Sequence, residues 1–298
     1  MQAPTSALTL CERLAAQCSI EATTRNIAEI DRYPGLLRAG TEVTIPWLPG
    51  APFHHTLSAA QRLRHAGFVP VPHLAARRLD SRELAVSWLR QLAAEAGVDR
   101  VIVIAGDAER TVGPYANALQ VIESGLLQDG GIVRVGIGAY PEGHPRIDAI
   151  SLERALIDKV AAAAGGGLAL QVVSQFCFEG ETIIRWLRGL RQMGIDTPVR
   201  VGLAGPANVR SLLAYATRCG IGPSVRAVWS GPVSLRDLLS RHGPDQVMVA
   251  LARALLEDTT LGPVDLHLYP FGGFQASADW VRRLGEGGLA EAVAAARP

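Results

Sequence analysis

Polar side chains that can exchange protons stand where short apolar runs of the sequence end. Glu21 and His73 close two such runs, Asp107 follows a third, and Tyr140-Pro141-Glu142-Gly143-His144-Pro145 and Gln175 end two more. Carboxylates and imidazoles are the usual acids and bases of enzymes, and a carboxamide can recognise the edge of a polar heterocycle. If the fold gathers these run ends, the sequence predicts a site for acid–base chemistry on a small polar molecule.

A metal site formed by some of the same residues is a less favoured hypothesis. His73, Asp107 and His144 could together bind a cation, but their separations match no known ligand spacing, and we assign no metal. The four cysteines include no CxxC pair and have no zinc-site spacing. We expect reduced, mostly buried thiols in a cytoplasmic protein.

The apolar runs alternate with helical patterns along the chain, and several are apolar at consecutive positions, which is typical of parallel strands covered on both faces. The predicted strands are Cys18–Glu21, Glu42–Trp47, Phe68–His73, Arg100–Ala105, Ile132–Tyr140, Leu168–Phe176, Val199–Ala204 and Val264–Tyr269. The predicted helices are Ser58–Ala66, Ser81–Ala96, Tyr115–Leu127, Leu152–Ala164, Gly180–Met193, Asn208–Cys219 and Asp245–Glu257.

This alternation favours one α/β fold, a (β/α)8 TIM barrel, with an open doubly wound sheet as the alternative. In a barrel the carboxyl ends of all strands meet at one rim, so the polar residues named above would share a site. Gly-Pro steps between Cys219 and Val264 indicate an inserted helical segment after strand 7. We treat residues 1–298 as a single catalytic barrel. His54-His55 falls in a proline-rich segment expected to be a solvated loop, and residues 289–298 are expected to form a terminal helix or a frayed end.

Composition narrows the possible partners. Of 298 residues 48% are hydrophobic, and 29 Lys and Arg side chains balance 28 Asp and Glu, which leaves no basic excess for nucleic acid. No apolar run approaches the roughly 18 residues that span a bilayer, and the first residues lack the basic start of a secretory signal. We therefore expect a cytoplasmic protein with a small-molecule substrate, no nucleic-acid or membrane partner, and homo-oligomers formed through apolar helix faces.

The segment Gly138-Ala139-Tyr140-Pro141-Glu142-Gly143-His144-Pro145 resembles, almost letter for letter, the fifth-strand motif of the methylenetetrahydrofolate reductases. The similarity continues in order from about Ser19 to Tyr269. Its other segments are Ser19-Ile20-Glu21, Pro72-His73-Leu74, Gly106-Asp107, Tyr115-Ala116, Ser174-Gln175-Phe176 and the helical phrase Leu187–Asp196. The chain is thus identified as a short, divergent, single-barrel member of that family.

The resemblance implies a reaction and roles for particular residues. The family interconverts 5,10-methylenetetrahydrofolate and 5-methyltetrahydrofolate, with hydride from NADH or NADPH passing through FAD. Glu21 matches the general acid, and Asp107 the carboxylate between flavin and folate. Glu21, Asp107 and Gln175 would bind the folate. The positions that match cofactor contacts are Thr44, His73, Gly106, Tyr115, Ala116, Tyr140, His144 and Lys159, the last being the only lysine of the chain.

Three segments depart from the family pattern. Ala22-Thr23-Thr24-Arg25 replaces Phe-Phe-Pro-Pro after the first glutamate, Phe271-Gly272-Gly273 replaces Leu-Asn-Arg after strand eight, and Ala105 stands where the family has a flavin-contacting arginine. These departures keep two alternatives open. One is a flavin-independent reductase in which NADH transfers hydride directly to the substrate, and the other is a non-catalytic folate-binding barrel.

Overall fold

The structure is a computed structural model that describes residues 6–28, 30, 35–206 and 244–286. Within these residues, parallel strands close into a barrel in the order β1 to β8, and β8 pairs with β1. The strands are β1 (Ser19–Glu21), β2 (Glu42–Ile45), β3 (Val69–Ala75), β4 (Arg100–Ile104), β5 (Arg134–Ala139), β6 (Ala169–Phe176), β7 (Val199–Ala204) and β8 (Val264–Tyr269). The predicted (β/α)8 barrel is confirmed, and the open sheet is excluded.

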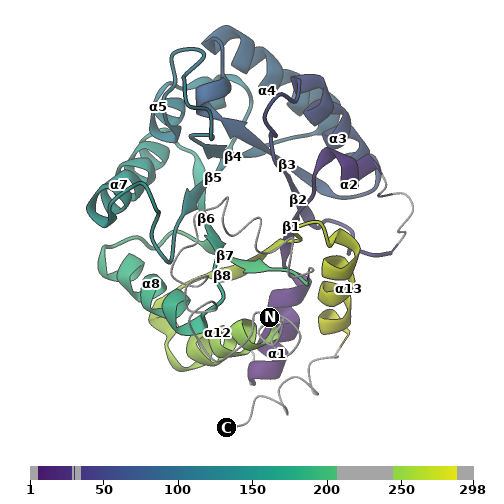
Figure 1. The fold of residues 1–298 in the computed structure, drawn as a ribbon, viewed down its shortest axis with the longest axis vertical. Helices are drawn as coiled ribbons and strands as arrows, with labels where there is room; N and C mark the ends of the chain where they lie inside the picture. The colour runs from purple at the N-terminus through teal and green to yellow at the C-terminus, as the bar shows by residue number, and fades with distance from the viewer. Residues whose placement is uncertain (1–5, 29, 31–34, 207–243, 287–298) are drawn as a thin grey trace.

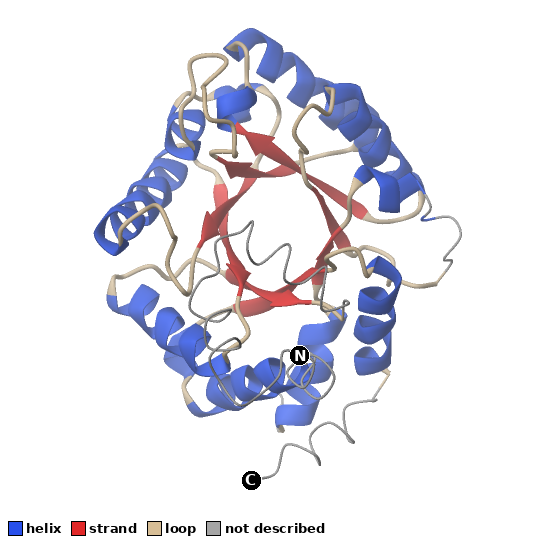
Figure 2. Ribbon diagram, in the orientation of Figure 1, coloured by secondary structure: helices blue, strands red, loops and turns tan. Residues whose placement is uncertain are grey.

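Helices surround the barrel on all sides, as Figures 1 and 2 show. They are α1 (Ala7–Ala16), α2 (Thr24–Ala28), α3 (Phe53–His65), α4 (Arg82–Ala96), α5 (Ala118–Glu123), α6 (Leu126–Asp129), α7 (Ala149–Gly165), α8 (Gly180–Gln192), α12 (Asp245–Glu257) and α13 (Phe274–Gly285). Two short 3-10 helices, η2 (Ala76–Arg78) and η3 (Thr259–Leu261), follow β3 and precede β8. The main core lies between the helices and the outer faces of the strands.

Local sequence signals explain where several helices begin and end. The Ser81 side chain accepts a hydrogen bond from the Leu84 amide and so caps α4, while Gly97 closes that helix in the left-handed conformation, at φ 59°. The Asp148 side chain caps α7 in the same way through the Ser151 amide. The leucines and Trp88 at three- and four-residue steps in α4 had predicted that helix to within one residue.

Some predicted boundaries were wrong. His54 and His55 lie in α3, not in a solvated loop, because that helix begins directly after Pro52, a residue that fits a helix start. The predicted helix from Tyr115 is two short helices, and the first begins only after Asn117, whose side chain caps it. Predicted strand ends moved by up to two residues. Helices α1, α2 and α13 were not predicted.

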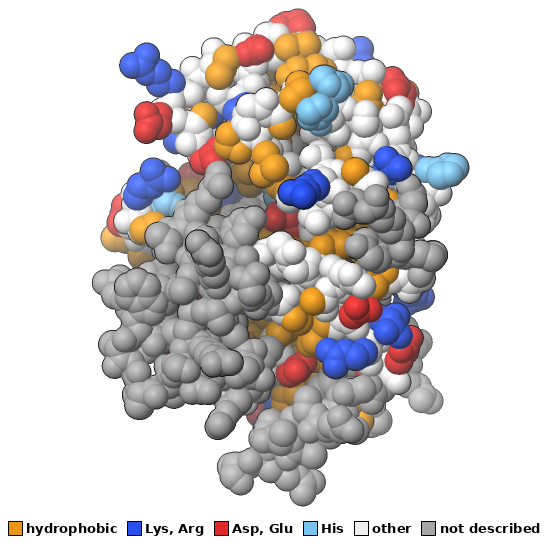
Figure 3. All heavy atoms as spheres, turned by 45° about the vertical axis from the view of Figure 1, so that its right-hand side comes forward, with side chains coloured by type: hydrophobic (Ala, Val, Ile, Leu, Met, Phe, Trp, Pro, Cys, Tyr) orange, Lys and Arg blue, Asp and Glu red, His pale blue; other side chains and the backbone are white. Residues whose placement is uncertain are grey.

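The segment after β7 is described only in part. The predicted helix Asp245–Glu257 is confirmed as α12, whereas the predicted helix at residues 208–219, most of the predicted insertion, and the tail at residues 289–298 lie outside the described residues. Of the four cysteines, Cys11, Cys18 and Cys177 are buried free thiols, as expected, and Cys219 also lies outside. On the face shown in Figure 3, acidic and basic side chains are interspersed and neither sign forms a continuous patch.

Candidate active site

Glu21 ends β1 and is the centre of the candidate site. Its carboxyl is partly buried at the carboxyl end of the barrel, and that burial raises its pKa to about 7. A carboxylate loses solvation when it leaves water, so its protonated form is favoured. At neutral pH about half of such groups carry a proton that can be donated, which is the property required of a general acid.

An aromatic cluster stands beside this carboxyl. Ile20 pairs in register with Leu268, which places Glu21 next to Tyr269 on β8. The Tyr269 ring stacks on Phe271 with centroids 6.0 Å apart and contacts Phe176, with centroids 5.9 Å apart, and its hydroxyl donates to the Ser174 carbonyl at 3.1 Å. The cluster supplies apolar surroundings that keep a carboxylic acid protonated.

Phe271 holds the backbone in an uncommon conformation. At φ 47° it is the one non-glycine residue with positive φ among the described residues. An aromatic side chain is strained in that region, and such strain is concentrated at functional sites. Phe271 is the first residue of the Phe271-Gly272-Gly273 segment that departs from the family pattern, and it follows shortly after the end of β8.

His73 on β3 is partly buried, and His267 on β8 is buried. Burial lowers the pKa of His73 to about 4 and that of His267 well below its usual value, so both rings are neutral at pH 7. His267 is hydrogen-bonded to the Ser19 hydroxyl at 2.8 Å, whereas the Nε2 atom of His73 is buried with no partner among the described residues. His73 therefore offers a ligand a hydrogen bond but no charge.

The turn after β4 depends on Gly106. This residue has φ 87°, and a Cβ atom there would lie 3.1 Å from the Cβ of Ala75, so both backbone and space favour glycine. The next residue, Asp107, is exposed at the mouth near Arg78, and it does not cap α5 because Asn117 does. The predicted role of Asp107 at the mouth is therefore compatible with its position.

Two arginines stabilise the loops around this turn through hydrogen bonds to backbone carbonyls. Arg77 donates to the Ala116 carbonyl at 3.0 Å and to the Ala108 carbonyl at 3.2 Å. Arg78 donates to the carbonyls of Trp47, Leu48 and Ala51, and its guanidinium lies 4.4 Å from the centre of the Trp47 indole. Both guanidiniums are thus committed to backbone carbonyls.

Tyr115 is buried in the core at the end of this segment, and Ala116 is exposed.

The motif after β5 forms a compact turn. Tyr140 and His144 contact each other edge-on with ring centroids 5.0 Å apart, and the His144 Nδ1 accepts from the Arg146 amide at 3.2 Å. A buried thiol joins this turn to the next strand, because Cys177 donates to the Glu142 carboxylate at 3.0 Å. This hydrogen bond links the ends of β5 and β6.

Gln175 lies at a bulge near the end of β6. Val173 pairs with Arg200 but Phe176 pairs with Gly202, so β6 contains one residue more than β7 between these pairs. Bulges re-aim side chains and are frequent beside active sites. The Gln175 Oε1 accepts from the Phe176 amide at 3.1 Å, while its amide nitrogen donates to none of the described residues and is free to meet a ligand.

Lys159 reaches the same end of the barrel from α7. Its ammonium donates to the Gly138 carbonyl at 3.4 Å, and burial lowers its pKa to about 8. A Cβ atom at Gly138 would meet no atom within 4 Å, which leaves open space there. The last predicted cofactor contact is Thr44, which pairs in register with Glu21 and is 2% exposed. Thr44 lines an interior cavity, and its hydroxyl has no hydrogen-bond partner among the described residues.

The structure also contains residues that sequence reasoning missed. Tyr269 ends β8 and could have been found by the same strand-end argument that selected Glu21. Glu42 and Arg200 stand at the starts of β2 and β7, where a charge within an apolar strand indicates an inward-facing polar contact.

In the part of the chain that the structure describes, no group of three His, Cys, Asp or Glu residues could hold a metal ion, and no helix is long and apolar enough to cross a bilayer.

Fold and site together define a class: a (β/α)8 barrel whose strand ends carry a partly buried carboxyl with a raised pKa, hydrogen-bonding groups and aromatic rings. Comparison with known proteins gives the family. The profile of the methylenetetrahydrofolate reductase family matches residues 21–230, and the chain belongs to that family.

The proteins that are similar to the chain include a bacterial reductase and a protein of known structure. The 5,10-methylenetetrahydrofolate reductase of Pectobacterium carotovorum subsp. carotovorum is 28% identical over 162 residues, which cover 52% of this chain and 50% of that protein, so the match spans half the length of this relative. An uncharacterized protein from Clostridium thermocellum that binds two copies of 5-methyl-5,6,7,8-tetrahydrofolic acid superposes with a TM-score of 0.54. Its identity is 13%, and the match covers 93% of this chain and 98% of that one. The second likeness shows the fold.

Proposed function

We propose that the protein interconverts 5,10-methylenetetrahydrofolate and 5-methyltetrahydrofolate, with NADH or NADPH as the hydride donor. The observation that carries the proposal is the Glu21 carboxyl, whose pKa burial raises to about 7 in a chain of this family. The reaction needs a proton donor at neutral pH, and few carboxyl groups in proteins are protonated there.

Glu21 would give its proton to N10 of the substrate. Protonation breaks the bond between N10 and the bridging carbon, and that carbon remains on N5 as a cationic iminium group. A hydride then adds to the carbon and leaves a methyl group on N5, so one proton and one hydride are consumed. The aromatic cluster excludes water around the acid, which keeps it protonated until the substrate binds.

Two further side chains would orient the folate. The free amide nitrogen of Gln175 can donate to a ring carbonyl of the pterin. Asp107 stands at the mouth after β4, where it can accept hydrogen bonds from the pterin amino and ring N–H groups. Together they would set the pterin so that N10 faces Glu21, and orientation of this kind contributes strongly to catalysis.

The groups at the mouth fit a flavin. His73 has a buried unpartnered Nε2, Gly138 leaves open space, and Lys159 supplies a cation for a diphosphate. Gly106, Tyr115, Ala116, Tyr140 and His144 would complete the contacts that the family resemblance predicts. FAD, when bound, would carry the hydride from the nicotinamide to the methylene carbon.

A second candidate, direct hydride transfer from NADH without flavin, is favoured by the charge at this mouth. Ala105 replaces the family arginine, and Arg77 and Arg78 are committed to carbonyls. Lys159 is then the one cation that we assign to a diphosphate at this mouth. Because its pKa is about 8, only about half of the molecules carry a charged Lys159 at that pH.

The absorption spectrum of the purified protein, combined with an assay, tests these candidates. A yellow protein, with flavin bands that NADH bleaches and methylenetetrahydrofolate restores, supports the flavin route. A colourless protein that oxidises NADH with methylenetetrahydrofolate, and gains nothing from added FAD, supports direct transfer. Folate binding without turnover under either condition would refute the proposed activity and leave a binding barrel.

Lys159→Met is expected to have opposite effects on cofactor affinity and stability. Removing the cation should weaken FAD binding about tenfold or more, because a charge-assisted contact to phosphate is lost. The folded-state pKa near 8 lies below the unfolded value of 10.5, so the buried ammonium destabilises the ligand-free protein increasingly as pH falls from 10.5 to 8. At pH 7 the variant should therefore be more stable by about 1–2 kcal/mol.

Flavin fluorescence titration and thermal unfolding at pH 7 measure the two effects. Arg154→Met is the matched control, because Arg154 lies on the same helix with its side chain 84% exposed, and it should change neither quantity. Unchanged FAD affinity in Lys159→Met would remove this lysine from the cofactor site. If the protein binds no flavin, the affinity for NADH is measured instead by the fluorescence of the nicotinamide.

A cytoplasmic location and a homo-oligomeric state complete the proposal. The support for oligomers is the exposure of apolar side chains on α7, where Ile150 is 79% and Ile157 is 45% exposed.

A further inference from the structure

An interior cavity of about 210 Å³ lies among the first residues of several strands, away from the mouth that carries Asp107 and Gln175. Arg134 and Ala169, the exposed first residues of β5 and β6, line it, so it reaches solvent at the amino-terminal end of the barrel. Its inner end is formed by Thr44 and His267. This volume corresponds to roughly seven water molecules, far too small for a folate or a dinucleotide.

Two buried hydrogen-bond donors in the lining lack acceptors among the described residues. The Thr44 hydroxyl, in a residue that is 98% buried, has no partner, and the buried Nε of Arg200 has none either. The exposed side chain of Arg134 makes no hydrogen bond or ion pair with any described residue, although it lies near enough to Asp99 to lower the pKa of that carboxyl. Leaving a buried donor unpaired costs about 1–3 kcal/mol, so Thr44 and Arg200 favour an acceptor in the cavity, to which Arg134 could add a charge at the solvent side.

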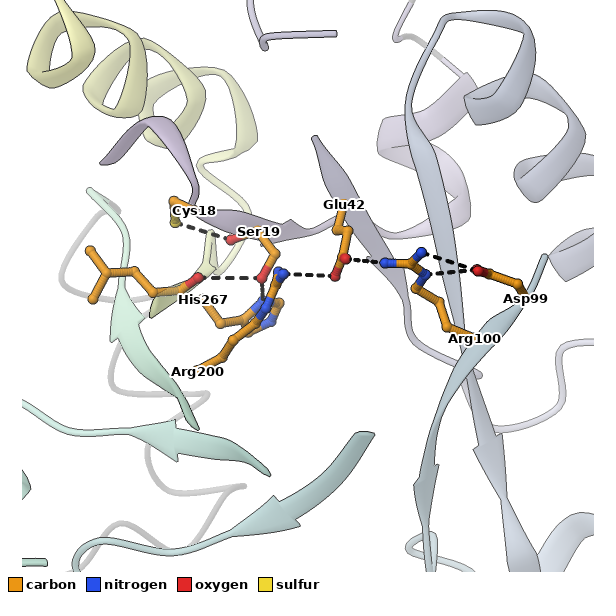
Figure 4. A network of polar contacts seen from close by, with 8 residues as sticks. Cys18, Ser19, Glu42, Asp99, Arg100, Arg200 and His267 are labelled. Atoms are coloured by element: carbon orange, nitrogen blue, oxygen red, sulfur yellow. Dashed lines mark hydrogen bonds and ion pairs between the residues drawn. The ribbon is translucent and has the colours of Figure 1, made fainter. Parts of the chain in front are cut away.

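The charges of the lining are unbalanced. Arg100, Arg134 and Arg200 face one carboxylate, Glu42, which is hydrogen-bonded to Arg100 and lies 3.0 Å from the Nη2 of Arg200. Figure 4 shows Arg200 between the Ser19–His267 pair and Glu42. His267 adds no charge, because burial keeps it neutral.

Two further carboxyl groups lie close to the cavity without lining it. Asp99 binds Arg100, and Asp265 pairs in register with Arg200. Burial raises the pKa of Asp265, while the nearby Arg200 and Arg13 act in the opposite direction. The excess charge of the lining itself therefore remains positive.

We propose that this cavity is a binding site for a small oxyanion, a carboxylate or a phosphate, that accepts hydrogen bonds from Arg134, the Nε of Arg200 and the Thr44 hydroxyl. An anion there would satisfy the unpaired donors and balance the excess positive charge in one step. The cavity opens at the other end of the barrel from the folate mouth, its inner residue Thr44 pairs in register with Glu21, and the inference does not rest on the proposed reductase activity. Its occupancy would instead stabilise the amino-terminal end of the barrel.

Calorimetric titration of the full chain with potassium phosphate and with potassium acetate tests the inference, with ionic strength held constant by potassium chloride. Saturable binding of one anion per chain is expected, and the tighter probe decides between a tetrahedral and a carboxylate ligand. Arg134→Gln should weaken that binding at least tenfold, because a charge-assisted contact is lost. Arg185→Gln, at an exposed arginine on α8 outside the cavity, should bind as the wild type does.

Crystals soaked in selenate would locate the anion by its anomalous signal. A peak between Arg134 and Arg200 is expected. The proposal is overturned if neither anion binds saturably, if Arg134→Gln retains wild-type affinity, or if the selenate peak lies only at the folate mouth. None of these outcomes would change the expected spectrum or folate turnover.

Discussion

Glu21→Gln is expected to lower kcat for methylenetetrahydrofolate reduction by about 100-fold or more. General acid catalysis contributes factors of about 10²–10⁴, and glutamine keeps the shape of the side chain while removing the proton. Glu21→Asp, which keeps an acid but moves it back by one methylene, should recover part of the lost rate. Glu109→Gln removes an exposed carboxylate near the same mouth and should leave kcat unchanged.

The pH dependence of the wild type gives a second test of this role. With a pKa of about 7, Glu21 loses its proton as pH rises, so the reduction rate should fall about tenfold per pH unit above that value. In the opposite direction, oxidation of methyltetrahydrofolate, the same group acts as a base, and the rate should rise and then level off above about pH 7. Steady-state assays from about pH 5.5 to about pH 9 in both directions measure this. A flat profile in both would rule out Glu21 as the acid.

Stability separates lost chemistry from lost folding in Glu21→Gln. The folded-state pKa near 7 lies above the unfolded value of 4.5, so the wild type is progressively destabilised as pH rises from 4.5 through 7. At about pH 8 the variant should therefore be more stable, by about 1–3 kcal/mol. A less stable variant would mean that its loss of activity has a structural cause.

Glu42→Gln is expected to destabilise the barrel by about 2–4 kcal/mol. The Glu42 carboxylate binds Arg100 and Arg200, and the three side chains are only 19%, 19% and 12% exposed. Removing its charge leaves Arg100 paired with Asp99 alone and takes from Arg200 the carboxylate that lies 3.0 Å away, which is costly because the positive charge in this poorly solvated space is then less well compensated. Chemical denaturation gives the free energy of unfolding, with Glu153→Gln on the exposed side of α7 as a control expected to stay within about 0.5 kcal/mol.

Phosphate should restore part of the stability lost in Glu42→Gln. An oxyanion in the cavity would replace the missing negative charge, so the unfolding temperature of the variant should rise more steeply with phosphate than that of the wild type. Equal responses of the two proteins would show that phosphate acts elsewhere. A loss below about 0.5 kcal/mol would show that this ion-pair network is not important for stability.

Most strands could be predicted from the sequence because parallel strands covered on both faces leave continuous apolar runs. The predicted helix Asp245–Glu257 agrees with α12 at both ends, since its apolar spacing is regular and Gly-Pro steps flank it. The omission of α1 was avoidable, because Ser6 is a standard helix cap and Leu10, Cys11 and Leu14 have helical spacing. Helix α13 lacks a side-chain cap, and nothing local marks where it begins. Helix α2 begins directly after Thr23, whose hydroxyl accepts from the Asn26 amide at 3.3 Å, so this cap was a signal that the prediction missed.

The linear sequence contains the strand–helix alternation and the order in which Glu21, His73, Asp107, Tyr140 and Gln175 come to strand ends, since these depend on local periodicity and on one motif. Which of these groups carry protons depends on the folded chain. The pKa of Glu21 rises, and that of His73 falls, because strands far apart in the chain exclude water around them. The bulge at Gln175 likewise depends on the register between two strands. Solvation and register are properties of neighbours in space, and the linear chain does not contain them.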